Sequence, residues 1–429
     1  MNNMSTESNA SPDGLIPRIV QLFLTSQLSI ILIIAALGLG IAAILVTPRE
    51  EEPQIVVPLA DVFVHAPGAN PEEIEKLVAT PLERLLWQID GVEYVYSMSR
   101  QDMAVVTVRF FVGQDREKSL IKLHNKITMN IDQVPPIVQN WVIKPVEIDD
   151  VSIVNATLYS ERHSDYELRR IGEEVLQRLS AVKDLSRTEI VGGRRREIRV
   201  ALQPERMTAH EVTLMETVAA LRGADTSVTA GRFNRFNREF SVTSNAFFNS
   251  ADEVARLMVG VHRDQPVYLR DIAEVRDGPE EPRHYSRISF SETYRNAQGL
   301  PPTPEDFPAV TLALAKKKGT NAVDVARNVL QELEALKATV IPDGVRVEIT
   351  RNYGHTAQQK VNGLLSSLAF AVISVVVLLA ITLGWREAMV VALAVPVSFA
   401  LALFVNFLLG YTINRVTLFA LILSLGLVV

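Results

Sequence analysis

The sequence predicts an α+β membrane protein in which transmembrane α-helices carry a large insert of repeated strand–helix units. Two observations support this prediction. The segments 28–46, 364–383 and 388–409 contain no charged residue and have 19, 20 and 22 residues, each enough for a helix to span a bilayer. Residues 47–363, between the first two segments, are instead rich in charge and patterned like a globular protein. The insert is therefore expected to lie outside the membrane.

The first apolar segment is interpreted as an uncleaved anchor and not as a secretory signal peptide. It begins after 27 residues, is longer than a typical signal-peptide core, and is followed by Thr47–Arg49, a poor cleavage site. The short connection Gly384–Glu387 contains one arginine, and basic residues favour the cytoplasmic side. By alternation, residues 1–27 are expected in the cytoplasm and the insert on the other side.

A fourth apolar segment, residues 416–429, has only fourteen residues. A spanning helix needs about 20, so we expect the sequence to be part of a longer protein. None of the four apolar segments contains Asp, Glu, Lys, Arg or His. Ionisable residues inside a membrane usually mark an ion or proton pathway, so these segments are expected to carry no proton relay.

The insert begins with the order strand, helix, strand, strand, helix. After the strand Leu59–Val64, Asn70 is expected to cap a helix with Pro71 at its first position. The helix has an apolar stripe, which is expected to be buried: Ile74, Leu77, Val78, Leu82, Leu85, Leu86 and Ile89. Strands 92–97 and 104–111 and a helix at 115–131 follow.

The same order then recurs. The strand Val151–Tyr159 is followed by a capping box, Ser164 with Glu167, that opens a helix. Strands are expected at 185–191 and 197–202, and Thr208 with Glu211 is interpreted as a second capping box, opening a helix that ends near Arg222. Such repeats indicate ferredoxin-like units. Strands 309–315 and 345–350, flanking a helix at 322–339, supply a further βαβ piece.

Residues 223–249 differ from the rest of the insert, because they are rich in Gly, Ser, Thr and Asn and alternate Phe with Arg. One interpretation is an extended hairpin with solvated arginines. The other is an arm that docks on a neighbouring chain, since aromatic residues and Arg are enriched at interfaces. The candidate docking residues are Arg232, Phe233, Arg235, Phe236 and Arg238.

The sequence argues against several function classes. It contains no phosphate-binding loop and no H-E-x-x-H, and the absence of cysteine excludes disulfides and thiolate metal sites. The net charge of −6 argues against nucleic acid as a partner. Arg194–Arg196 and Lys316–Lys318 are interpreted as solvated turns, and Asp149–Asp150 as turn residues. We expect a protein that is not an enzyme and holds no metal.

Motifs along the whole chain resemble the RND (resistance-nodulation-division) efflux transporters, closest to the hydrophobe/amphiphile (multidrug) branch. The motifs occur in the family's order and spacing. They are Pro48–Pro53, Pro67–Glu73, Thr80–Glu83, Gly91–Val92, Trp385–Ala388, Ala394–Ser398, Leu409–Asn414 and the apolar run from Leu418 to Val429.

The resemblance implies a multi-pass inner-membrane protein with a large periplasmic domain, in contact with membrane lipid. It implies proton-driven export of small molecules without a cofactor, by a homotrimer that works with a periplasmic adaptor and an outer-membrane channel. Residues 49–133 would be the first porter subdomain, and 134–188 with 275–345 the second. Residues 189–274 would be a docking subdomain, whose arm at 223–249 reaches into the neighbouring protomer.

The resemblance also suggests where substrate and protons bind. Phenylalanines that line the family's drug pocket correspond to Val151 and Val191, which would give an aliphatic lining. The family's proton-carrying aspartates would come at 430 and 431, so residues 1–429 alone are expected to be inactive. The alternatives are a heavy-metal exporter, a membrane-anchored periplasmic sensor or assembly subunit, and a protein-export accessory of the same superfamily.

Overall fold

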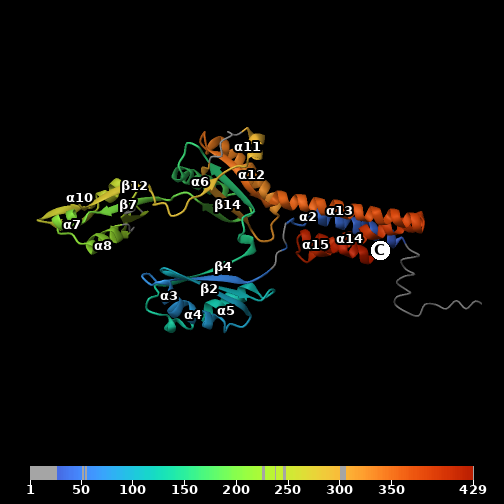
Figure 1. Cartoon of the computed structure of the whole chain (residues 1–429), viewed down its shortest axis with the longest axis horizontal. Coiled ribbons are helices and arrows are strands. Elements are labelled where there is room, and N and C mark those ends of the chain that lie inside the picture. The colour runs from blue at the N-terminus through green and yellow to red at the C-terminus, as the bar shows by residue number, and fades with distance from the viewer. Residues whose placement is uncertain are drawn as a thin grey trace, which may run out of the picture.

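The structure is a computed structural model that describes residues 27–50, 53, 56–224, 228–236, 238–244, 248–299 and 306–428. The molecule is elongated (Figure 1). A bundle of apolar helices forms one end, two α/β units lie in the middle, and a third α/β module forms the other end. The predicted fold class, membrane helices with a mixed α/β insert, matches this arrangement.

The first unit is a four-stranded antiparallel sheet with helices on one face. Its strands are β1 (Leu59–His65), β2 (Val92–Arg100), β3 (Met103–Phe110) and β4 (Asn140–Val146), in the order β2-β3-β1-β4. Alternate residues of β1 and β3 are buried against the helices, as expected for a sheet with one covered face. Because β4 pairs with β1, the first unit extends to Val146, past the predicted boundary at residue 133.

The helical layer of this unit begins at the predicted cap. Asn70 and Glu73 form a capping box at the start of α3 (Pro71–Ile74), which continues into the π-helix η1 (Glu75–Ala79) and α4 (Thr80–Leu86). A later helix, α5 (Arg116–Thr128), completes the layer. The prediction that Leu77 is buried was wrong, because its side chain is 48% exposed. A π-turn adds a residue to the helical repeat and rotates the apolar stripe there.

The second unit has the same order of elements, but its strands come from two separate stretches of sequence. Its elements are β5 (Val154–Tyr159), α6 (Asp165–Leu179), β6 (Leu185–Val191), β14 (Phe307–Lys316), α12 (Ala322–Thr339) and β15 (Arg346–Asn352). The strand order is β6-β14-β5-β15, and the two-residue strand β13 (Arg287–Ile288) pairs with the start of β14. This unit therefore extends to Asn352, beyond the predicted end at residue 345.

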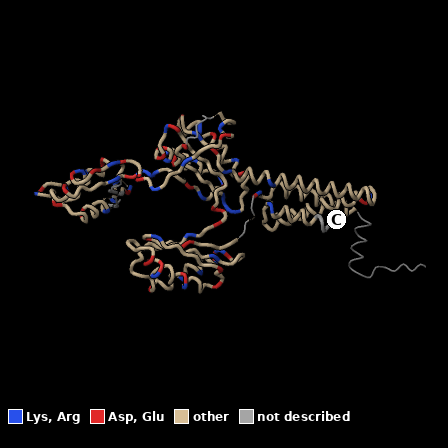
Figure 2. The backbone as a smooth tube through the Cα atoms, in the orientation of Figure 1, with Lys and Arg blue, Asp and Glu red and all other residues tan. Residues whose placement is uncertain are grey.

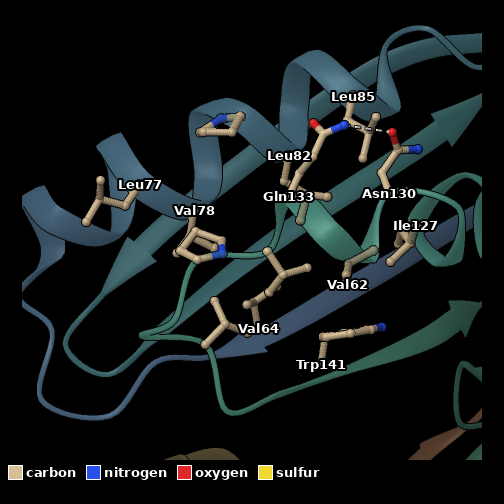
Figure 3. A pocket seen from close by; sticks show the side chains of 14 residues that line it. Val62, Val64, Leu77, Val78, Leu82, Leu85, Ile127, Asn130, Gln133 and Trp141 are labelled. Atoms are coloured by element: carbon tan, nitrogen blue, oxygen red, sulfur yellow. Dashed lines mark hydrogen bonds between the residues drawn. The ribbon is translucent and has the colours of Figure 1, made fainter.

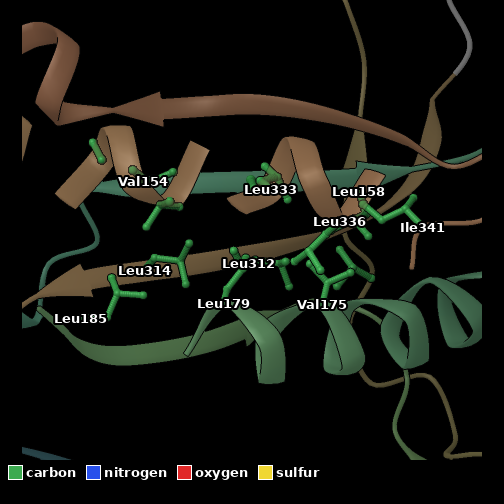
Figure 4. Packing of buried hydrophobic residues seen from close by; sticks show 14 of the residues in the cluster. Val154, Leu158, Val175, Leu179, Leu185, Leu312, Leu314, Leu333, Leu336 and Ile341 are labelled. Carbon is green, nitrogen blue, oxygen red and sulfur yellow. The ribbon is translucent and has the colours of Figure 1, made fainter. Parts of the chain in front are cut away.

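The core of the second unit lies between the sheet and both helices (Figure 4). Leu158 and Leu312 point from the strands toward Val175 of α6 and Leu333 of α12, and all four side chains are buried. The capping box that Ser164 and Glu167 were predicted to form is present at the start of α6.

The third module is inserted between β6 and β14. In this module β7 (Arg196–Leu202) pairs with β12 (Ala273–Pro279), so the module extends to Pro279 and starts after Val191, unlike the predicted range 189–274. Its other elements are α7 (Pro204–Ala209), α8 (Leu214–Ala224), β8 (Val228–Arg235), β9 (Arg238–Ser244), α9 (Ala251–Ala255), β10 (Met258–His262), β11 (Gln265–Tyr268) and α10 (Leu269–Ile272). It has a small core of its own around Val254, Leu269 and Ile272.

The predicted capping box of Thr208 with Glu211 was wrong. Thr208 lies inside α7, where its hydroxyl donates to the carbonyl of Pro204. Glu211 has a left-handed backbone, with φ of 55°. The cap of α8 is instead Thr213, whose hydroxyl accepts from the backbone N–H of Glu216, while the Glu216 carboxylate accepts from the N–H of Thr213.

Four apolar helices form the other end of the molecule: α2 (Leu28–Val46), α13 (Tyr353–Thr382), α14 (Trp385–Leu408) and α15 (Arg415–Val428). Among the described residues, three helices are long and apolar enough to cross a membrane, and α15 is shorter. Lys, Arg, Asp and Glu are concentrated in the α/β parts (Figure 2).

Two predicted boundaries of these helices change. Helix α13 begins at Tyr353, directly after β15, with Asn352 as its cap. The connection between α13 and α14 is shorter than the predicted Gly384–Glu387, because α14 already begins at Trp385. Gly384, with φ of 119°, makes the turn.

Candidate functional site

The face of the second sheet opposite its helices is the main candidate site, and its centre is buried: Thr157 is 4% exposed and Tyr159 is 6% exposed. Side chains alternate along a strand, and the core contains every second residue of β5. The residues that alternate with them, Asn155, Thr157 and Tyr159, therefore face the side away from the helices. Thr157, at the centre, forms side-chain hydrogen bonds at 2.9 Å to Thr311 of β14 and at 3.2 Å to Thr350 of β15. These three threonines form a hydroxyl row across three strands, which gives the face a polar centre.

An aromatic cluster borders the hydroxyl row. The ring of Tyr159 lies 5.2 Å from Phe290 and 5.8 Å from Phe307, and Phe290 stacks on Tyr294 at 5.2 Å. Tyr294 belongs to α11 (Glu292–Gln298), so this helix and the residues before it cover one end of the sheet face. Rings in these tilted and stacked arrangements attract one another beyond their apolar burial.

Two hydroxyls of the cluster have perturbed acidities. The Tyr294 hydroxyl donates to the carboxylate of Glu348 on β15, which stabilises the protonated phenol and raises the pKa of Tyr294 to about 12. Burial raises the pKa of Tyr159, against the opposing effect of Arg346. At neutral pH both tyrosines therefore remain neutral, and the face presents hydroxyls and rings beside one acid.

The two predicted substrate residues lie at opposite ends of this sheet. Val191, the last residue of β6, is opposite Thr311 and is 51% exposed. Val151, 47% exposed, precedes β5 and follows the 3₁₀-helix η3 (Ile148–Asp150). Strand register places the neighbours Val154 and Thr188 level with each other, both opposite Leu314. Val151 lies three residues before Val154, and Val191 lies three residues after Thr188, so the two valines are displaced in opposite directions. At ~3.3 Å per residue, Val151 and Val191 are about 20 Å apart along the strands.

The residues of the hydroxyl row and the aromatic cluster were missed by the sequence reasoning. The alternation of polar and apolar residues in Val154–Tyr159 could have singled out Thr157. Its partners Thr311 and Thr350 come from strands more than 150 residues away in sequence, as their separations of 154 and 193 residues show. No local pattern reveals such pairs.

The segment with alternating Phe and Arg forms the hairpin β8–β9, as the first interpretation predicted. Phe233 stacks on Phe240 across the two strands at 5.2 Å, and Arg232 pairs with Glu239 at 3.2 Å. At the tip, Phe236 has a left-handed backbone and is 86% exposed, with the Arg235 guanidinium 5.1 Å from its ring. Arg238 stands opposite Arg235 in the pairing. Residues 225–227, 237 and 245–247 of the predicted arm lie outside the described residues.

A separate apolar pocket lies inside the first unit (Figure 3). Leu82 and Leu85 of α4 point into it from one side and Val62 and Trp141 of the sheet from the other, while Asn130 and Gln133 are hydrogen-bonded at its edge. Its volume is about 80 Å³. Pockets for drug-sized molecules measure about 300–1,000 Å³, so this pocket is too small for a substrate of that size.

The predictions for the charged runs need correction. Lys316 is not in a solvated turn: it is 6% exposed, and its ammonium donates to Glu50 at 2.5 Å and lies 3.4 Å from Asp149. Lys317 and Lys318 are exposed, as predicted. The prediction failed because strand β14 continues through Lys316, and the side chain of this last strand residue is buried.

The arginine run is ion-paired. The Arg194 guanidinium contacts both carboxylate oxygens of Asp165 at 2.8–3.0 Å and holds the pKa of Asp165 below its ordinary value. Arg196 forms a similar pair with Asp277. These pairs flank the crossing from the second unit to the third module. No three His, Asp or Glu side chains in the described part of the chain are close enough to hold a metal ion.

The chain is similar to known transport proteins. A family model described as the AcrB/AcrD/AcrF family matches residues 19–429. The multidrug resistance protein MdtC of Yersinia enterocolitica is 25% identical over 412 residues, and the proteins of that name from Yersinia pseudotuberculosis and Yersinia pestis are 26% identical over the same length. Each match covers 95% of this chain and 39% of the relative, so the chain spans about two fifths of the length of these relatives.

Proposed function

The chain belongs to the AcrB/AcrD/AcrF family of RND efflux permeases, and from this premise we propose that it forms the N-terminal part of a proton-driven pump for small amphiphilic molecules. The names of its relatives, which describe multidrug resistance proteins, favour organic substrates over metal ions. The pump would use the proton gradient and no bound cofactor.

The architecture supports a division of labour between the parts. Helices α2, α13, α14 and α15 would lie in the inner membrane. The two βαββαβ units, with the shared strand order second-third-first-fourth, are ferredoxin-like, and we assign them as periplasmic porter subdomains. The third module would be the docking subdomain that contributes to trimer assembly and carries contacts to the outer-membrane channel, with a periplasmic adaptor completing the pump.

The single observation that supports the substrate assignment is the combination of aromatic rings and hydroxyls on the face of the second sheet opposite its helices. Amphiphilic molecules need apolar contact together with a few polar partners. The half-buried rings of Phe290 and Tyr294 would supply the apolar contact. The hydroxyls of Thr311 and Thr350, both bonded to the buried Thr157, would supply the polar partners. We assign Val191 to this surface, beside Thr311, and Val151 to its far end.

We further propose that the hairpin β8–β9 docks on a neighbouring protomer. Its exposed tip combines an aromatic ring with arginine, a composition enriched at protein interfaces. The energy would come from ionisable groups elsewhere, since the charge-free segments 28–46, 364–383, 388–409 and 416–429 hold none. Residues 1–429 alone would then not transport.

The test is export by the permease expressed from its complete gene in cells that lack their own efflux pumps. Cells preloaded with a fluorescent amphiphilic dye should lose it faster than cells with an empty vector, and a protonophore should abolish the difference. Dye loss equal to the vector control, or loss that is insensitive to the protonophore, would contradict the proposal. Resistance to metal salts without dye export would favour the heavy-metal alternative.

A further inference from the structure

A short strap of residues, Thr47–Glu50, connects the end of helix α2 to several other parts of the molecule. The carbonyl of Pro48 accepts from the N–H of Ile413 at 2.9 Å, and the N–H of Glu50 donates to the carbonyl of Ile413 at 3.1 Å. The carbonyl of Arg49 accepts from the N–H of Ala322, the first residue of α12, at 3.2 Å. The strap is therefore bonded both to the connection between α14 and α15 and to the second unit.

Lys316 brings a third part of the molecule to the strap. It is the last residue of β14, and its ammonium contacts Glu50 of the strap at 2.5 Å and Asp149 at 3.4 Å. Asp149 belongs to η3, which connects β4 of the first unit to β5 of the second. One buried ammonium thus joins the end of a membrane helix, the linker between the two α/β units and the second sheet.

Stability alone is a weak reason for a buried charge cluster. Taking charges out of water is unfavourable, and replacing a buried ion pair by apolar residues of similar volume is often neutral or stabilising. Glu50 is 4% exposed and Lys316 is 6% exposed, so this argument applies to both. What an ion pair adds is a fixed register between the segments that carry its members, and here those segments come from three parts of the molecule.

We propose that Lys316 is a positioning residue through which movement of the membrane helices is passed to the two α/β units during export. The strong contact with Glu50 keeps the strap in register with β14. The longer contact with Asp149 holds the linker between the units and breaks first when the units move apart. This inference rests on the proposed transport function and adds a mechanical connection to it.

The deciding variant replaces the cluster by uncharged residues: Glu50→Leu, Lys316→Met and Asp149→Asn together, in the complete permease. Its melting temperature and its affinity for the dye should stay close to those of the wild type, while the maximum rate of dye export in proteoliposomes falls at least tenfold. Lys317→Met, which removes the exposed neighbouring lysine, should export at the wild-type rate, and Lys316→Arg should retain most of it. Wild-type export by a stably folded triple variant would overturn the proposal.

If the triple variant fails to fold, Asp149→Asn alone gives the answer, because it leaves the Glu50–Lys316 pair intact. It should lower the maximum rate several-fold without changing the affinity for the dye. An unchanged rate would overturn the proposal in that case.

A second measurement does not depend on transport and separates this proposal from the proposed function. Residues 1–429 contain no cysteine, so Glu117→Cys on α5 and Glu174→Cys on α6 introduce labelling sites, one on each unit, once any cysteine elsewhere is replaced. Spin labels at these sites should show a broader distance distribution in the triple variant than in the intact cluster. An identical distribution would overturn the connection even if the wild type exports dye. If the wild type does not export but the distribution broadens, only the transport function is contradicted.

Discussion

Gly40 of α2 lies directly against Ala400 of α14: a Cβ added at Gly40 would lie 2.3 Å from the Cβ of Ala400 and 2.6 Å from its Cα. Helices in a membrane associate through such close contacts between small residues. The contact explains why a glycine stands at position 40, because any larger side chain would collide with α14.

The variant Gly40→Val should separate α2 from α14 and destabilise the membrane bundle by about 1–3 kcal/mol, the usual effect of overpacking. The shift can be measured as the loss of helix signal during unfolding in mixed micelles. Gly38→Val is the matched control, because no atom outside its own stretch of helix lies within 4 Å of a Cβ at Gly38. Equal destabilisation by both variants would contradict the assigned contact.

The hydroxyl row predicts a characteristic pattern in threonine-to-valine variants. Thr157→Val keeps the shape of the side chain but removes its hydrogen bonds to the half-buried Thr311 and the exposed Thr350, and should lower the free energy of unfolding by about 0.5–1.5 kcal/mol. The triple variant with valine at all three positions should recover much of the loss, because no hydroxyl is then left unpaired. Denaturant unfolding of the wild type and both variants measures this. A triple variant less stable than Thr157→Val would count against the row as a unit.

The hydroxyl of Tyr294 should ionise at a higher pH than that of an ordinary tyrosine. Its folded-state pKa of about 12 lies above the ordinary value of 10.0, so its contribution to stability is fully present below pH 10 and is lost as the pH rises toward 12. Ultraviolet absorbance should show one tyrosine that ionises late, and this signal should be missing in Tyr294→Phe. In Glu348→Gln the same tyrosine should ionise nearer pH 10. A late-ionising tyrosine that persists in both variants would rule out this pair as its cause.

The elements predicted best from the sequence are those whose signals are local. The caps at Asn70 and Ser164 were correct because each depends on a partner three residues away. The second capping box failed because Thr208 with Glu211 and Thr213 with Glu216 follow the same pattern. Pro204, at the start of α7, decides between them by placing Thr208 inside an earlier helix.

The strand pairings and the charge cluster could not be predicted in this way. Strand β4 joins the first sheet by pairing Ile143 with Val62. Strand β7 follows β6 in the sequence but pairs with β12 in a separate sheet and not with the second sheet. Lys316 and Glu50 are 266 positions apart in the sequence. Burial and register between such distant segments arise only from the assembled fold. From the sequence alone, all three lysines of the run are predicted to be solvated, and only the structure shows that Lys316 is buried.

The hairpin β8–β9 should decide whether the protein assembles as a trimer. Phe236 at its tip is 86% exposed, so Phe236→Glu should leave the folding of the protomer unchanged while removing an apolar anchor and adding a charge at the proposed interface. Native mass spectrometry of the complete permease in detergent should show trimers for the wild type and mostly monomers for the variant. Met215→Glu, on α8 of the same module and also exposed, is the matched control and should remain trimeric. If Phe236→Glu assembles as well as Met215→Glu, the hairpin tip is not the docking element, because a buried charge without a partner should weaken any interface that encloses it.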